Sequence, residues 1–136
     1  MKLYLETGTL LILTRPGGLR DEWGDWLEGR LIAGDRLYTS TFALVELDRR
    51  LRGEKRAAAF PEFLADVEAL VETVLPLGIS ALRRALTLET AHDMDRARAR
   101  HAALVLEHEL DGLVAPDEDY AQVPGLTYLA PDPRDG

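Results

Sequence analysis

Short apolar runs and longer amphipathic segments follow one another along the chain, a pattern that predicts strands and helices in turn. The runs that predict strands lie at 2–5, 36–39, 74–77, 113–115 and 127–129. The apolar segment 9–14 predicts a continuation of the first run into a loop that Pro16-Gly17-Gly18 closes. Because strands alternate with helices, we expect a mainly parallel sheet with helices on both faces.

The predicted helices begin at residues that cap or open helices well. Their starts are expected at Asp21, at Ser40 or Thr41, at Pro61, at Ser80 and at Asp95. The first helix has Trp23, Trp26 and Ile32 on its inner face, and the second ends at Gly53. Right-handed crossovers would bring the carboxyl ends of all the parallel strands to one edge, where open α/β sheets bind ligands.

Acidic residues fall at that edge. Glu6 follows the first strand, and Asp117 and Asp119 follow the strand that ends at residue 115. Glu46 lies between apolar neighbours on the second helix, where an unpaired carboxylate is costly to bury. We therefore expect these acids to share a site. Carboxylate oxygens are ligands that Mg²⁺ and Mn²⁺ favour, and such a cation can stabilise developing charge on a phosphodiester.

Each acid also has a purely structural interpretation. Glu6 could cap a helix or a turn, and the two aspartates could be turn residues. Glu46 could pair with Arg49 or Arg50. His101 and His108 lie two turns apart on one predicted helix and are expected to be packing or surface residues. Four acids at one sheet edge nevertheless favour a shared site.

Composition limits the class of protein. The chain has 136 residues, 46% of them apolar and 29% charged, and it has no cysteine, which excludes disulfides and thiolate chemistry. We expect one globular domain at 1–130 and a short Pro-rich tail at 131–136. The absence of any apolar run of about 20 residues, and of a secretory signal, predicts a cytoplasmic protein without a membrane span.

The net charge of −8 makes the chain a poor general binder of polyanions. Nucleic acid could bind only where basic residues are grouped beside the acids. Two such groups of basic residues occur. Each could instead be the solvated face of a helix. They consist of Arg49, Arg50, Arg52, Lys55 and Arg56, and of Arg96, Arg98 and Arg100.

Four segments, in this order and spacing, resemble the PIN domain of the VapC-type toxin ribonucleases. They are LYLET at 3–7, TSTFALVEL at 39–47, VLPL at 74–77, and LVAPDEDY at 113–120 followed by VPGL at 123–126. The resemblance spans nearly the whole chain. It implies a three-layer α/β/α sandwich with a short, mainly parallel central sheet.

The resemblance also implies a function. It predicts a hydrolase, a Mg²⁺- or Mn²⁺-dependent endoribonuclease acting as the toxin of a type II toxin–antitoxin pair, with RNA, a small antitoxin and a second copy of the chain as partners. Glu6, Glu46 and Asp117 would be catalytic and would hold the metal together with Asp119. The phosphate-steering residues would be Arg49, Arg50 and Arg52.

The chain departs from the family pattern at four positions. Glu6 stands where the family has Asp, Gly8 where it has Ser, and Ala115 where it has Thr. The largest departure is Arg98, which occupies the place of the third family acid. A guanidinium stays charged and can pair with a carboxylate through two hydrogen bonds. We therefore expect Arg98 to neutralise Glu46 or Asp117 and to weaken or replace the metal.

These departures keep other interpretations open. One is a catalytically degenerate PIN-fold protein that binds RNA or a protein partner without cleavage. Another is an unrelated flavodoxin-like or receiver-like domain, but the chain has no phosphate loop and no pair of acids after the first strand. The order of the four segments favours the nuclease.

Overall fold

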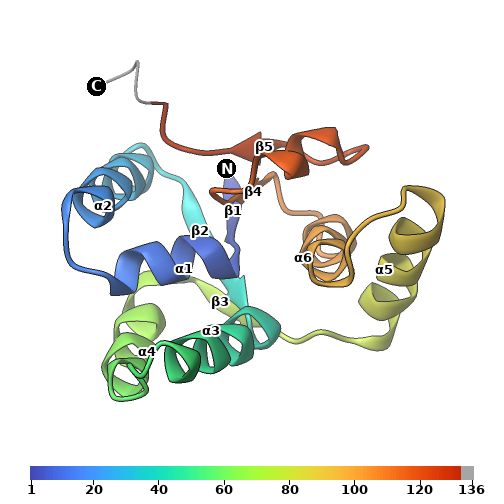
Figure 1. Ribbon diagram of the computed structural model, residues 1–136. Coiled ribbons are helices and arrows are strands. Elements are labelled where there is room, and N and C mark those ends of the chain that lie inside the picture. Colours follow the sequence, from blue (N-terminus) through green and yellow to red (C-terminus); the bar gives the residue numbers. More distant parts are fainter. Residues whose placement is uncertain (133–136) are drawn as a thin grey trace.

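β1 (Lys2–Leu5) lies in the middle of a parallel sheet with the strand order β3-β2-β1-β4-β5 (Figure 1). The computed structural model describes residues 1–132. Within them the other strands are β2 (Arg36–Ser40), β3 (Thr73–Leu75), β4 (Gly112–Val114) and β5 (Tyr128–Leu129). Each neighbouring pair is parallel, with Tyr4 opposite Tyr38 on one side and Leu113 on the other. The predicted parallel sheet is confirmed.

The helices cover both faces of this sheet (Figure 1). α1 to α4 lie on one side and α5 and α6 on the other, so the molecule is the expected three-layer α/β/α sandwich. The helix bounds are α1 Thr7–Thr14, α2 Gly18–Ile32, α3 Thr41–Gly53, α4 Ala59–Leu70, α5 Ile79–Ala91 and α6 Arg96–Glu107, and a short 3₁₀ helix, η1, spans Glu118–Gln122. Within residues 1–132 no helix is both long and apolar enough to cross a membrane.

Strand periodicity explains why there are two cores. Successive side chains of β1 point to opposite faces, so Leu3 and Leu5 pack with α1 to α4, whereas Tyr4 packs with α5 and α6. All three side chains are fully buried. The predicted helix α3 buries Leu47 and Leu51 in the first core, as its apolar spacing indicated.

Several local predictions were wrong. Segment 9–14 is helical, because Glu6 caps α1 and the helix buries Leu10 and Leu11 in the core. α5 begins at Ile79 with Gly78 at its N-cap and no side-chain cap, so Ser80 does not cap it. α2 begins before Asp21, and Ile32 at its end is exposed rather than inward. The boundary at residue 130 stays a prediction, and residues 133–136 of the predicted tail lie outside the described residues.

Ser40 has two structural roles at the end of β2. Its Oγ accepts a hydrogen bond from Ala43 N at 3.0 Å, which caps α3, and it lies 2.7 Å from the hydroxyl of Tyr4. Ser40→Ala is expected to lower the free energy of unfolding by about 1–2 kcal/mol. Denaturant unfolding would measure the change. The adjacent, exposed Thr41 provides the control, and an equal loss in Thr41→Ala would contradict the assignment of the cap to Ser40.

Candidate functional site

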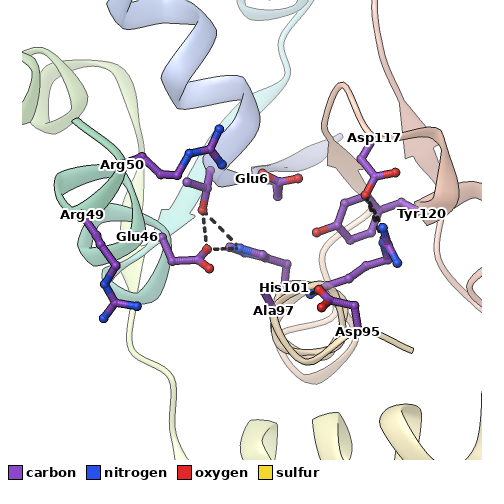
Figure 2. A pocket seen from close by; sticks show the side chains of 11 residues that line it. Glu6, Glu46, Arg49, Arg50, Asp95, Ala97, His101, Asp117 and Tyr120 are labelled. Carbon is purple, nitrogen blue, oxygen red and sulfur yellow. Dashed lines mark hydrogen bonds and ion pairs between the residues drawn. The ribbon is translucent and has the colours of Figure 1, made fainter. Parts of the chain in front are cut away.

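A pocket of about 360 Å³ opens at the carboxyl edge of the sheet (Figure 2). Side chains from α1, α3 and α6 and from the loop after β4 converge on it. The sequence-predicted residues that line it are Glu6, Glu46, Asp117, Arg49, Arg50 and Arg98. Arg52 is absent from this lining, and its guanidinium pairs with Asp48 one helical turn away at 3.0 Å. The fold therefore brings together most of the predicted site, from four separate segments.

Glu6 is both a cap and a pocket residue. It is the N-cap of α1, and its carboxylate accepts a hydrogen bond from Gly8 N. The side chain is only 8% exposed, and this burial raises the pKa of Glu6 above its usual value against the opposing effect of His101. A Cβ at position 8 would lie 2.9 Å from Cγ of Pro116. The packing of Pro116 thus accounts for the glycine where the family has serine.

The raised pKa of Glu6 predicts a pH-dependent change in stability. A carboxyl group that binds its proton more tightly in the folded state destabilises the fold as the pH rises past its unfolded pKa. Glu6→Gln keeps an oxygen that can accept from Gly8 N. We expect its free energy of unfolding to exceed that of the wild type at pH 7 and the difference to shrink below about pH 4. A difference that is the same at both pH values would contradict the assignment.

Glu46 is fixed by two hydrogen bonds to one of its oxygens. Thr7 Oγ1 donates to Glu46 Oε1 at 2.6 Å, and His101 Nε2 lies 2.6 Å from the same oxygen (Figure 2). Partial burial raises the pKa of Glu46, but the hydrogen bonds from His101 and Thr7 outweigh this effect and lower the pKa overall. Glu46 Oε2 makes no hydrogen bond to any residue in 1–132. The site therefore contains a fixed carboxylate with one oxygen available.

His101 continues this network into the core. Its Nδ1 lies 2.7 Å from the Tyr4 hydroxyl, which in turn lies 2.7 Å from Ser40 Oγ. The imidazole is only 2% exposed and also contacts the ring of Phe42. His101 was expected to be a packing or a surface residue; it is packed, and its bond to Glu46 was not foreseen. The spacing offered a signal, because His101 follows Arg98 by three residues and so shares its face of α6.

Arg98 neutralises Asp117, one of the two partners predicted for it. Its Nε and Nη2 reach Asp117 Oδ2 at 3.0 and 2.7 Å, and Nη2 lies 3.2 Å from Asp119 Oδ2. The bond to Asp117 raises the pKa of the guanidinium further. Asp117 Oδ1 accepts from Asp119 N at 3.0 Å and so caps η1, while Asp95 caps α6 as expected. Asp119 joins the site through Arg98 but does not line the pocket.

The predicted metal ligands do not form a ligand set in this arrangement. Glu6 is engaged by the start of α1, Glu46 by Thr7 and His101, and Asp117 by Arg98. Within the part of the chain that the structure describes, no group of three or more histidine, aspartate or glutamate side chains is placed to hold a metal ion. A divalent cation at Asp117 would have to displace the guanidinium. The residues present therefore do not fit the implied metal as they stand.

Comparison with known proteins agrees with the motifs, although no protein-family model matches the chain. A VapC ribonuclease from Mycobacterium bovis and ribonuclease VapC13 from Mycobacterium tuberculosis are each 29% identical to it over 105 residues. These alignments cover 76% of this chain and 80% of each relative. Both relatives are VapC ribonucleases, the class of protein that the four segments resemble.

Solved structures show the same fold. VapBC2 from Rickettsia felis, bound to a DNA fragment from its promoter, matches with a TM-score of 0.74 and 14% identity, over 97% of this chain and 100% of the other. VapC20 from Mycobacterium tuberculosis, a toxin that cleaves the sarcin–ricin loop, matches with a TM-score of 0.70 and 18% identity, over 88% and 92%. The fold, the motifs and these relatives together indicate a PIN-domain protein of the VapC type.

Proposed function

We propose that this chain is an endoribonuclease and the toxin of a type II toxin–antitoxin pair. The observation that carries the proposal is the convergence of Glu6, Glu46 and Asp117 in one pocket at the carboxyl edge of a PIN-type sheet. VapC ribonucleases at 29% identity support the same activity. They favour cleavage over the alternative of a PIN-fold protein that only binds RNA or a protein.

Glu46 is the residue that we propose to act on the reacting atoms. Cleavage of a phosphodiester needs a group that takes a proton from the attacking oxygen, and a positioned carboxylate can do this. The bonds from Thr7 and His101 fix Glu46 through Oε1 and leave Oε2 available. Its lowered pKa keeps it ionised at neutral pH. We propose Glu6 and Asp117 as the other acids of the catalytic group.

Arg49 and Arg50 are the proposed phosphate-binding residues. Both are exposed and line the pocket, and neither forms an ion pair with any residue in 1–132. Figure 2 shows the guanidinium of Arg50 turned toward Glu6, whereas Arg49 points away from the centre of the pocket. Arg52 lies one turn further along α3 and is proposed only for the longer-range attraction of RNA. This local positive charge allows an acidic chain to bind a polyanion.

Mg²⁺ or Mn²⁺ is the cofactor that the resemblance to the family implies. The carboxylates that would bind it already have partners within the chain, so we assign the roles above to side chains alone. For partners, the similarity to the solved VapBC2 structure supports a small antitoxin, and we propose that one binds this chain. A homodimer and a cytoplasmic location are further parts of the proposal.

The activity can be tested with labelled RNA. Purified protein would be incubated with an RNA mixture in magnesium, in manganese and in EDTA, and the products separated on a denaturing gel. We expect discrete cleavage products in at least one of the three conditions, and their loss in Glu46→Gln. An absence of products in all three conditions would contradict the proposed function.

A further inference from the structure

Arg98 brings a positive charge to the pocket wall, beside the carboxylates of Asp117 and Asp119. Its side chain is 25% exposed and lines the pocket. Two of its three nitrogens are used on Asp117, with Asp119 as a second acceptor. Nη1 makes no hydrogen bond to any residue in the described range 1–132. The guanidinium therefore has a donor left over for a ligand.

The pocket lining holds three guanidinium groups beside four carboxylates, and each of these carboxylates accepts a hydrogen bond from within the chain. Asp117 is neutralised by Arg98, and Asp95 is engaged as the cap of α6. The Glu6 carboxylate is buried and accepts a hydrogen bond from Gly8 N at the start of α1. Arg49 and Arg50 add two charges that have no ion-pair partner among residues 1–132. The remaining carboxylate, Glu46, is held by Thr7 and His101 at the other side of the pocket.

The ion pair between Arg98 and Asp117 adds little to the stability of the fold. Asp117 is 36% exposed, and pairs as accessible as this one contribute about 0–1 kcal/mol. The stacking partner of Arg98 is Tyr120, whose ring centre lies 5.9 Å from the guanidinium carbon. Asp117, Asp119 and Tyr120 together hold the guanidinium at the pocket wall. Such a fixed, oriented cation is a means of binding a phosphate oxygen.

We propose that Arg98 is the resident cation of this pocket, which takes the place of a divalent metal at Asp117 and binds a phosphate of the RNA backbone. That the ligand is RNA rests on the proposed ribonuclease function. This role of Arg98 departs from the family pattern, since it makes RNA binding independent of divalent metal. The two parts can be measured without any cleavage assay.

The first test measures metal binding. Manganese would be titrated into the wild type, Arg98→Asp, and Arg98→Asp combined with Asp117→Asn, by calorimetry. Wild type is expected to show no saturable binding, Arg98→Asp to bind with a dissociation constant at least tenfold below the highest manganese concentration used, and the double variant to lose that binding. Equal binding by wild type and Arg98→Asp would overturn the proposal. So would the failure of Arg98→Asp to bind, since the arginine would then not be what displaces a cation.

The second test measures RNA binding with a fluorescent 2′-O-methyl oligoribonucleotide in EDTA. Wild type is expected to bind equally well in EDTA and in magnesium, and Arg98→Gln about tenfold more weakly. The slope of log affinity against log salt should fall by about 0.7 when one phosphate contact to a single strand is lost. Arg83→Gln removes the same charge from an exposed position on α5 that makes no ion pair among residues 1–132.

The outcomes separate this inference from the activity. Loss of oligonucleotide binding in EDTA, or an Arg98→Gln variant that matches Arg83→Gln in affinity and salt slope, would overturn the role of Arg98. Thermal unfolding of each variant would confirm that it folds. If the binding results are as expected but no RNA is cleaved under any condition, the ribonuclease proposal fails and the phosphate site stands.

Discussion

Glu46→Gln is expected to lower the rate of RNA cleavage by about 10²–10⁴-fold, the usual contribution of a positioned acid or base. The amide keeps the size of the side chain and can still accept the bond from Thr7 at Oε1. It cannot take up a proton at the position of Oε2. Single-turnover cleavage of a labelled RNA, with the enzyme in excess, would measure the change at the chemical step.

The control for this variant is Glu62→Gln. Glu62 is an exposed acid on α4, outside the pocket, and makes no ion pair with any residue in 1–132. Its replacement changes the net charge equally and should leave the rate unchanged. A rate for Glu46→Gln within threefold of the control would show that Glu46 does not act on the reacting atoms.

Tyr4→Phe is expected to cost about 1–3 kcal/mol of the free energy of unfolding. Tyr4 is fully buried, and its hydroxyl lies between Ser40 Oγ and His101 Nδ1, both at 2.7 Å. Removing the hydroxyl leaves two buried polar groups with one partner fewer. Since His101 then loses the bond that orients its ring, cleavage should also slow. Urea unfolding would measure the stability, and the labelled-RNA assay the rate.

Tyr38 provides the matched control on the neighbouring strand. It is 8% exposed and lies opposite Tyr4 in the sheet, and its hydroxyl makes no hydrogen bond to any residue in the described part of the chain. Tyr38→Phe is therefore expected to change stability by less than about 0.5 kcal/mol. Equal losses in the two variants would mean that the Tyr4 hydroxyl does not support His101.

Much of the fold could be predicted because the strands and α3 carry clear signals. Ser40 before an apolar helical pattern that ends at Gly53 predicts α3, and the structure has that helix with Glu46 at the pocket. α1 was missed because its run of Leu, Leu and Ile reads equally well as an extended apolar segment. Glu6 stabilises the helix by capping its N-terminus, a role that was one of the structural interpretations of this residue.

The site could be predicted only in part, because the choice of partners depends on side-chain geometry. Sequence placed Glu6, Glu46 and Asp117 at one edge but could not decide whether Arg98 pairs with Glu46 or with Asp117. The structure pairs it with Asp117 and leaves Glu46 to His101. The orientation of Arg98 is set by Asp117, which caps η1, and by Asp119 within η1, a segment separate from α6. No local pattern encodes such a contact.

The most direct test of this account is a crystal structure of the wild-type protein grown in manganese chloride, with anomalous data. We expect Arg98 to remain on Asp117, with no manganese within coordination distance of the Asp117 oxygens. Manganese bound between Asp117 and Glu46, with the Arg98 side chain turned out of the pocket, would contradict it.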